Sequence, residues 1–316
     1  MRAILQKRSG SADRLSLSDV PRPDPGPGEL LVRIHATSVT RGDVILRKMP
    51  TIVTRLVGET PKSIPGHEFA GEVAAIGEEV ARFGVGDRVF GATTGLSGGS
   101  HAEYVVVPES GVVAAIPTGV GYREAAPVPV GAMAALHFLR TGGVGEGTKL
   151  LVNGASGSVG TFAVQIAKAL GAHVTGVAGP SNTALVESLG ADDVIDYTEQ
   201  DFTAASHRFD VIFDAVGKTS AKKVQGVLTD GGQYVSTRAR RRETVEELLT
   251  IRDMMETGAV RAVIDRSYPL DQIAEAHRYV QGGHKPGNVV IDVVPESRSE
   301  LARPSPARAS DEREGV

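Results

Sequence analysis

The stretch Asn153-Gly-Ala-Ser-Gly-Ser-Val-Gly160 has the residue types and spacing that say most about chemistry. An apolar run at 150–152 predicts a buried strand before it, and the apolar spacing at 159–170 predicts a helix after it. Glycines between a strand and a helix let a pyrophosphate approach free N–H groups at the positive end of the helix dipole. We therefore predict dinucleotide binding by residues of this loop, namely Asn153, Ala155, Ser156, Gly157, Ser158, Val159 and Gly160.

Three small residues of this loop have different expected roles. Gly157 has no Cβ, so the backbone can come close to a bound pyrophosphate, and Gly160 lets the helix pack closely on the strand. Ala155 stands where the usual pattern has its first glycine, and a slightly wider turn accommodates its methyl group.

The end of the next strand indicates which cofactor binds. An NAD site usually has a carboxylate there, but the segment 177–182 has none, which favours NADPH because no negative charge repels a 2′-phosphate. Ser181, Asn182 and Tyr197 are candidate hydrogen-bonding groups for that phosphate. We favour a solvated face for the arginine run at 238–242, although a loop that folds over would bring its charge to the phosphate.

Strand and helix patterns alternate at short spacing from residue 149 to about residue 236, which predicts a doubly wound parallel sheet and an α/β fold. Right-handed crossovers place the carboxyl ends of all these strands at one edge, where ligands bind. We expect the residues at the strand ends to contact the cofactor, among them Ala178, Gly179, Tyr197, Ala215, Val216 and Thr237.

Residues 1 to about 120 show short β-like runs separated by Gly and Pro turns, which predicts a compact β-barrel-like domain. The strand and helix patterns after residue 260 are expected to rejoin it, with the substrate between the two domains. We therefore expect a catalytic domain at 1–122 and 261–294 and a nucleotide domain at 123–260. The tail at 295–316, rich in Ser, Arg, Glu and Pro, is predicted to be disordered.

Composition excludes several classes of protein. The net charge of −4 gives no basic signal for nucleic acid or membrane surfaces, and the absence of cysteine excludes disulfides, thiolate zinc sites and a cysteine nucleophile. No apolar run approaches the roughly 18 residues of a membrane span. The first residues form a strand pattern rather than a signal peptide, which fits a cytoplasmic protein.

Several further motifs are shared with one family, in that family's order along residues 1 to 294. The chain resembles the zinc-independent medium-chain dehydrogenases/reductases of the quinone oxidoreductase type. The resemblance implies a GroES-like β-barrel catalytic domain plus a Rossmann domain, an NADPH cofactor and reduction of quinones or other α,β-unsaturated carbonyls. It rests on the loop 153–160 and on Val39-Thr-Arg-Gly-Asp43, Ile64-Pro-Gly-His-Glu-Phe-Ala-Gly-Glu-Val73, Phe83-Gly-Val-Gly-Asp-Arg-Val-Phe90, Leu189-Gly-Ala-Asp-Asp-Val-Ile-Asp-Tyr197, Phe213-Asp-Ala-Val-Gly217 and Gly287-Asn-Val-Val-Ile291, whose Asn288 joins the expected cofactor contacts.

The resemblance also bears on metal binding. Members with catalytic zinc use a Cys, the His of a Gly-His-Glu motif and a later Cys or Asp. Here His67 matches the middle ligand, whereas Thr40 and the region of Val130 occupy the other positions. One imidazole with one optional carboxylate does not make a closed three-ligand site, so we expect no metal.

Without metal, catalysis depends on aligning the acceptor with the cofactor, and the oxygen that gains charge needs a hydrogen-bond donor. The candidate donors are Thr40, Arg47 and His67, and Asp43 is expected to orient the local backbone or Arg47. The histidines at 101 and 137 are expected to be structural.

Two alternatives to a reductase stay open: an NADPH-binding sensor or structural protein without efficient chemistry, and a zinc-free alcohol dehydrogenase, which lacks a visible base. The segment near 236–245 is shorter than in the family, which often has there a further strand at the dimer edge. A homodimer is therefore expected only with this reservation.

Overall fold

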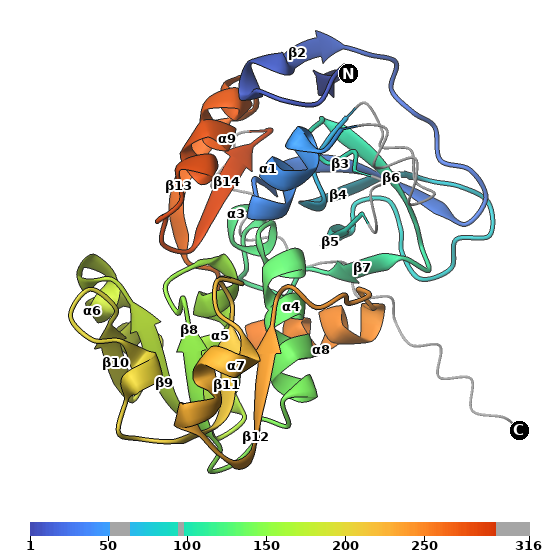
Figure 1. The fold of residues 1–316 in the computed structure, drawn as a ribbon. Coiled ribbons are helices and arrows are strands. Elements are labelled where there is room, and N and C mark those ends of the chain that lie inside the picture. Colours follow the sequence, from blue (N-terminus) through green and yellow to red (C-terminus); the bar gives the residue numbers. More distant parts are fainter. Residues whose placement is uncertain (51–63, 94–97, 295–316) are drawn as a thin grey trace, which may run out of the picture.

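The molecule has two lobes, each built on its own sheet (Figure 1). The computed structural model describes residues 1–50, 64–93 and 98–294. The predicted disordered tail at 295–316 lies outside the described residues. The predicted α/β class, with a GroES-like lobe and a parallel-sheet nucleotide lobe, is confirmed.

The nucleotide lobe contains a five-stranded parallel sheet in the order β10-β9-β8-β11-β12. Its central residues Leu150, Leu151 and Val152 are fully buried, because helices cover both faces of such a sheet. The strands are β8 (Lys149–Asn153), β9 (His173–Ala178), β10 (Asp193–Asp196), β11 (Phe209–Asp214) and β12 (Leu228–Ser236). The helices of this lobe are α4 (Val128–Thr141), α5 (Ser158–Ala169), α6 (Thr183–Ser188), α7 (Ala221–Val224) and α8 (Val245–Glu256), with short 3-10 turns at Pro180–Asn182, Phe202–Ala204 and Gln225–Val227.

The other lobe is built on a seven-stranded sheet with the path β13-β14-β3-β4-β5-β7, and β6 pairs with β3. The strand β14 pairs antiparallel with β3, so the chain after residue 260 returns to the first lobe, as expected. The strands are β3 (Glu29–Ser38), β4 (Glu68–Ile76), β5 (Arg88–Ala92), β6 (Tyr104–Pro108), β7 (Val112–Ala115), β13 (Ile264–Pro269) and β14 (Asn288–Asp292), with a separate hairpin of β1 (Arg2–Gln6) and β2 (Leu15–Asp19). The helices are α1 (Arg41–Lys48), α3 (Tyr122–Ala125) and α9 (Ile273–Gly282), with 3-10 turns at Ala12–Arg14 and Leu270–Gln272.

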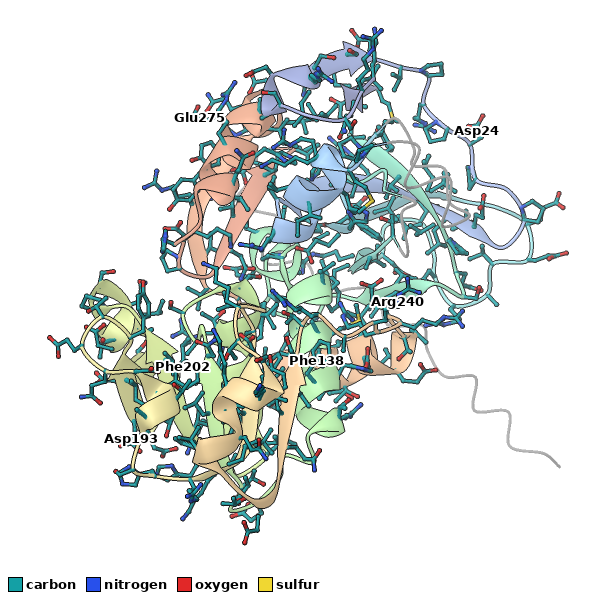
Figure 2. All side chains as sticks on the ribbon, viewed as in Figure 1. Asp24, Phe138, Asp193, Phe202, Arg240 and Glu275 are labelled. Carbon is teal, nitrogen blue, oxygen red and sulfur yellow. The ribbon has the colours of Figure 1, made fainter. Side chains whose placement is uncertain are left out.

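One of the hydrophobic clusters spans both lobes. Phe90 of β5 and Val112 of β7 belong to the same buried cluster as Phe138 of α4 and Phe213 of β11. Phe138, labelled in Figure 2, lies in the helix at the lobe boundary and packs near the ring of Phe213. Helix α8 contacts both α4 and β7. This continuous packing fixes the two lobes against each other and so positions side chains that face the boundary.

Strands β10 and β12 form the two edges of the parallel sheet in the described part of the chain. The short segment after β12 leads directly into α8 and forms no further strand, as the shortened sequence predicted. Among the described residues, no helix is long and apolar enough to cross a membrane. The expectations of a homodimer and of a cytoplasmic location stay predictions.

Candidate cofactor and acceptor site

The glycine loop (residues 153–160) connects β8 to α5 at the carboxyl edge of the parallel sheet. The loop turns through a Gly157 N to Gly154 O hydrogen bond of 3.0 Å, and Gly157 is the N-cap of α5. Within the part of the chain that the structure describes, no side chain caps α5. The first N–H groups of a helix have no intrahelical acceptor, so this end suits an anion.

The predicted difference between Gly157 and Gly160 is visible in the packing. A Cβ on Gly160 would lie 2.0 Å from Gly154 O and 2.8 Å from Ala155 Cα, so only glycine fits between helix and loop. A Cβ on Gly157 would meet only Gly154 O, at 3.4 Å, an ordinary contact. The fold therefore requires Gly160 but leaves the surroundings of Gly157 open, as a bound pyrophosphate would need.

The methyl group of Ala155 fits because Gly176, on the neighbouring strand, has no side chain. Ala155 is fully buried, and its Cβ lies 3.0 Å from where a Cβ on Gly176 of β9 would stand. The methyl group thus occupies space that Gly176 leaves free. The sequence places these two residues 21 positions apart, so the loop motif alone does not reveal the compensation.

Asp214, at the end of β11, holds the strand ends together. Its side chain is fully buried and accepts hydrogen bonds from Asn153 Nδ2 (2.9 Å), Tyr234 Oη (3.1 Å) and the backbone N–H groups of Gly217 and Thr219. Asn153 is therefore committed to the scaffold. Sequence reasoning included Asp214 in a family motif but missed this role, for which a carboxylate at the end of a buried strand was the available signal.

The other predicted cofactor residues lie at the same edge of the sheet. The ring of exposed Tyr197 lies beside Gly179, with its hydroxyl 3.2 Å from where a Gly179 Cβ would stand, and Val216 packs against Gly154 in the same way. Ser181 is exposed and Asn182 half-buried in the turn after β9. Of the remaining members of the set, Ala178 ends β9, and Ala215 and Thr237 directly follow β11 and β12.

Asn288 supports the glycine loop from the other lobe. Its Oδ1 accepts a hydrogen bond from Ser158 Oγ (2.5 Å), and its Nδ2 donates to Val263 O (3.1 Å). The neighbouring Gly287 N donates to Ser156 O (2.8 Å). Asn288 is 3% exposed and both of its polar atoms have protein partners, so it supports the loop, and its predicted contact with a cofactor stays a prediction.

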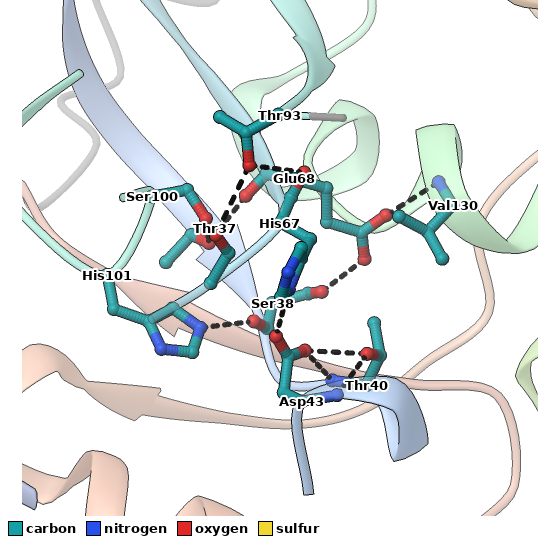
Figure 3. Close-up of polar contacts among 11 residues, drawn as sticks. Thr37, Ser38, Thr40, Asp43, His67, Glu68, Thr93, Ser100, His101 and Val130 are labelled. Carbon is teal, nitrogen blue, oxygen red and sulfur yellow. Dashed lines mark hydrogen bonds and ion pairs between the residues drawn. The ribbon is translucent and has the colours of Figure 1, made fainter. Parts of the chain in front are cut away.

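The catalytic candidates Thr40, Asp43 and His67 come together at the lobe boundary (Figure 3). Thr40 is the N-cap of α1 and forms a capping box with Asp43, whose Oδ2 accepts from Thr40 N (2.8 Å) and Oγ1 (2.6 Å). The other carboxylate oxygen, Oδ1, lies 2.7 Å from His67 Nδ1. Asp43 thus orients His67 as well as the helix end, and the spacing Thr-x-x-Asp was the sequence signal for the cap.

In the Asp43–His67 pair, Asp43 is fully buried and His67 is half-buried, and each group favours the charged form of the other. Burial alone would raise the pKa of Asp43, but the hydrogen bond and positive charge of His67 hold the pKa well below its usual range. Burial alone would lower the pKa of His67, but Asp43 outweighs burial and raises the pKa above its ordinary value. Among the described residues, His67 Nε2 is buried without a hydrogen-bond partner, so a protonated His67 has one N–H available to an oxygen.

Glu68 joins the two lobes next to this pair. It accepts a hydrogen bond from Ser38 Oγ through Oε1 and from Val130 N of α4, at 2.8 Å, through Oε2. Burial raises the pKa of Glu68 to about 7, although both hydrogen bonds oppose the rise. Thr40, Asp43, His67, Glu68 and the Val130 peptide are called the interlobe cluster below. The sequence contains Glu68 in the Gly-His-Glu motif, but it gave no sign that this carboxylate links the two lobes.

Two neighbours fix the His67 backbone. Gly66 has a φ of +95°, and a Cβ there would lie 2.4 Å from the His101 ring. His101 is fully buried, with Nε2 2.9 Å from Ser38 O, which agrees with the structural role expected for it. Burial lowers the pKa of His101. The close contact of Gly66 and His101 therefore explains why glycine precedes His67.

Arg47 is not brought to the interlobe cluster. Its guanidinium points to the other side of α1, where Nη1 donates to Gly10 O and Nη2 donates to Gln281 Oε1 at 2.8 Å. The side chain is 2% exposed. Of the two expectations for Asp43, the one that it orients Arg47 is wrong, whereas the one that it orients the local backbone is confirmed by the hydrogen bond from Thr40 N. His137 lies elsewhere on α4, 3.0 Å from Glu247.

The arginine run divides into two kinds of side chain. Arg238, Arg240 and Arg242 are exposed, as predicted for a solvated face. Arg241 is 13% exposed and lies against α4, where Nη2 donates to Val130 O (3.1 Å) and pairs with Glu243 (3.2 Å). The solvated-face prediction is therefore wrong for Arg241, because the short connection to α8 carries this residue to the lobe boundary.

Comparison with known proteins places the chain among the dehydrogenases. Residues 26–118 match the family described as alcohol dehydrogenase GroES-like domain, and residues 158–259 and 238–291 match families described as zinc-binding dehydrogenase. The chain is 33% identical to the 2-methylene-furan-3-one reductase of Solanum lycopersicum, over 90% of this chain and 77% of that protein. It is 30% identical to the mitochondrial NAD(P)H oxidoreductase RTN4IP1 of Mus musculus, over 85% and 82%. The quinone oxidoreductase from Coxiella burnetii superposes with a TM-score of 0.82 at 26% identity, over 93% of this chain and 99% of that one.

The chain belongs to the quinone oxidoreductase-like medium-chain dehydrogenases/reductases. The resemblance recognised in the sequence is thereby confirmed. In this chain, the glycine loop is the candidate site for a dinucleotide cofactor, and the interlobe cluster is the candidate site for a metal ion.

The residues of the interlobe cluster do not fit a zinc ion. His67 has one free ring nitrogen, whereas the Thr40 hydroxyl donates to Asp43 and both Glu68 oxygens accept hydrogen bonds. Across residues 1–50, 64–93 and 98–294, no three His, Asp or Glu side chains gather as a group that could hold a metal ion. Zinc needs at least three such ligands. The glycine loop, in contrast, fits a dinucleotide, since Gly157 leaves the end of α5 open.

Proposed function

We propose that this protein is an NADPH-dependent, zinc-independent reductase of quinones or other α,β-unsaturated carbonyls. The observation that carries the proposal is the interlobe cluster where the two lobes meet: among the described residues it offers an imidazole paired with a carboxylate and no group of three metal-ligating side chains. The names of the tomato and mouse relatives, an enone reductase and an NAD(P)H oxidoreductase, support the same class of reaction.

The cofactor would be held by backbone rather than by charged side chains. The N–H groups at the start of α5, next to Gly157, would hold the pyrophosphate, and the strand ends near Tyr197 and Val216 would hold the adenosine half. The absence of a carboxylate at 177–182 is the reason to propose NADPH over NADH. Ser181, Asn182 and Tyr197 are the proposed phosphate contacts. When bound, the cofactor supplies a hydride from C4 of its nicotinamide.

The chain's own residues handle the proton. As an enone accepts hydride at its β-carbon, negative charge develops on its carbonyl oxygen, and His67 Nε2–H donates a hydrogen bond or the proton to that oxygen. Asp43 keeps the imidazole protonated and fixes its orientation, and Thr40 fixes Asp43. Thr40 therefore acts through Asp43, and Arg47 has no proposed part in the chemistry.

A zinc-free alcohol dehydrogenase is the second candidate, because the Asp43–His67 pair supplies the base that seemed absent from the sequence. The raised pKa of His67 favours the protonated form, which suits reduction better than alcohol deprotonation. A sensor without turnover is the third candidate.

Turnover separates these candidates. Purified protein is assayed for oxidation of NADPH or NADH by 1,4-benzoquinone and by 2-cyclohexen-1-one. In separate assays it is tested for oxidation of simple alcohols with NADP⁺, and its zinc content is measured. We expect NADPH oxidation by the quinone or the enone, a lower KM for NADPH than for NADH, and substoichiometric zinc. Tight NADPH binding with no turnover would support the sensor, and stoichiometric zinc with alcohol oxidation would overturn the proposal.

A further inference from the structure

Arg241 has a buried guanidinium group with one unused donor. Its Nη2 is engaged with Val130 O and Glu243, whereas Nη1 is buried and makes no hydrogen bond within the described residues. A buried donor without an acceptor destabilises a fold, so such groups are uncommon unless something else satisfies them. A ligand oxygen would satisfy Nη1.

Arg241 belongs to the same place as the interlobe cluster. The carbonyl of Val130 accepts from Arg241, and the N–H of the same residue donates to Glu68. Glu243, the partner of Arg241, also contributes to the raised pKa of His67. Val130 of α4 therefore connects the guanidinium to Glu68, and the charge of Glu243 reaches the neighbouring His67. His67 Nε2 is another buried nitrogen without a partner among the described residues.

The chain reaches this position because the connection between β12 and α8 is short. Ser236 ends β12 at the carboxyl edge of the sheet, and Thr244 caps α8 by accepting from Glu247 N at 3.2 Å. The segment between them crosses the start of α4, and only Arg241 among its four arginines turns inward. Arg240 of the same segment is labelled in Figure 2 and is exposed.

We infer that Arg241 is a substrate-binding residue whose Nη1–H binds the carbonyl oxygen of the acceptor and stabilises its negative charge. The inference rests on the proposed reductase function. Hydride adds to the β-carbon of an enone, the π pair of the C=C bond moves to form an enolate, and the C4–H bond of the reduced nicotinamide breaks. Arg241 opposes the enolate charge, and a proton from His67 or solvent then completes the saturated ketone. The acceptor is thereby reduced and NADPH is oxidised to NADP⁺.

The experiment compares Arg241→Met with Arg240→Met, which changes an exposed neighbour in the same way. Binding of cyclohexanone, a ketone without a reducible double bond, is followed by ligand-observed NMR on the protein without cofactor. Thermal midpoints and NADPH affinities are measured for both variants. We expect at least tenfold weaker cyclohexanone binding for Arg241→Met alone, with little change in NADPH affinity.

Turnover supplies the second readout. Removal of one donor from an oxyanion site lowers kcat by about 100-fold or more, so Arg241→Met should lose about 100-fold with 2-cyclohexen-1-one. The loss with 1,4-benzoquinone should be smaller, because its reduced form spreads the charge over the ring and a second oxygen. Arg241→Lys, which keeps the charge but not the planar fork, should fall between wild type and Arg241→Met, and it replaces Arg241→Met if that variant does not fold.

Equal cyclohexanone binding by the variants at 240 and 241 would overturn the inference. An equal loss with both acceptors, accompanied by a lower thermal midpoint, would also overturn it and show that Arg241 only fastens the segment. If the wild type oxidises no NADPH with either acceptor, the proposed function fails, and the cyclohexanone measurement still decides whether Arg241 binds a carbonyl oxygen.

Discussion

The glycine loop and the interlobe cluster are built in opposite ways. The loop is one contiguous stretch, and its function depends on backbone N–H groups that glycine leaves accessible. The interlobe cluster is assembled from α1, the segment before β4, and the start of α4, with Arg241 contributed by the connection to α8. The contiguous loop sets its turn locally and takes only supporting contacts from Gly176, Asp214 and Asn288, whereas the assembled site exists only through the packing of distant segments.

The largest expected effect is the loss of packing at Gly160. Gly160→Ala forces a Cβ against two backbone atoms that cannot move freely, so we expect a loss of about 2–4 kcal/mol in unfolding free energy. Gly157→Ala, the matched control, should lose less than about 1 kcal/mol. Urea unfolding of both variants measures the difference, and equal losses would show that the loop does not separate packing from binding as described.

The next effect concerns the interlobe cluster. His67→Gln removes the proposed proton donor but keeps a polar side chain, so kcat with 2-cyclohexen-1-one should fall about 100-fold while the Kd for NADPH stays unchanged. His137→Gln, in a histidine that pairs with Glu247 away from the cluster, serves as the control. Similar rates for the two variants would remove His67 from the chemistry.

Glu68 tests the electrostatics of the assembled site through stability. Its pKa of about 7 in the fold lies above the ordinary 4.5, so between these values the folded state holds a proton that the unfolded state has lost. Wild-type stability attributable to Glu68 therefore falls as pH rises from about 4.5 to 7 and stays low above that. The free energy of unfolding of Glu68→Gln should exceed that of the wild type by about 1–3 kcal/mol at pH 8, with no such difference at pH 4. Denaturant titrations at the two pH values provide the check, and a Gln variant that is less stable at pH 8 would refute this account of the burial.

The smallest effect is a displacement of the pH profile. Since Asp43 raises the pKa of His67, the protonated donor persists to higher pH in the wild type than in Asp43→Asn. The decline of kcat with rising pH should therefore move to lower pH in Asp43→Asn. Steady-state rates across pH 5 to 9 measure the shift, and an unmoved profile would show that His67 does not control the decline.

The comparison also explains which features the sequence could predict. Strand, loop and helix at 149–170 followed from local apolar spacing, and the roles of Gly157 and Gly160 followed from the missing Cβ. The partners of Asp43 and Arg47 did not follow, because both residues lie on α1 and only tertiary packing decides that one faces His67 and the other Gln281. The sequence also could not distinguish Arg241 from the three neighbouring arginines, because only the packing of the short connection to α8 places its side chain against α4.

The central claim is that a phosphate-bearing nicotinamide cofactor binds at the start of α5. Gly157→Asp places a carboxylate at the open position where the pyrophosphate is expected to lie, without meeting the packed atoms that surround Gly160. Titration of NADPH into the wild type and into Gly157→Asp measures the two dissociation constants and so tests the claim directly. We predict at least 100-fold weaker binding by the variant, with a nearly unchanged thermal midpoint; equal affinities in the two proteins would contradict the account.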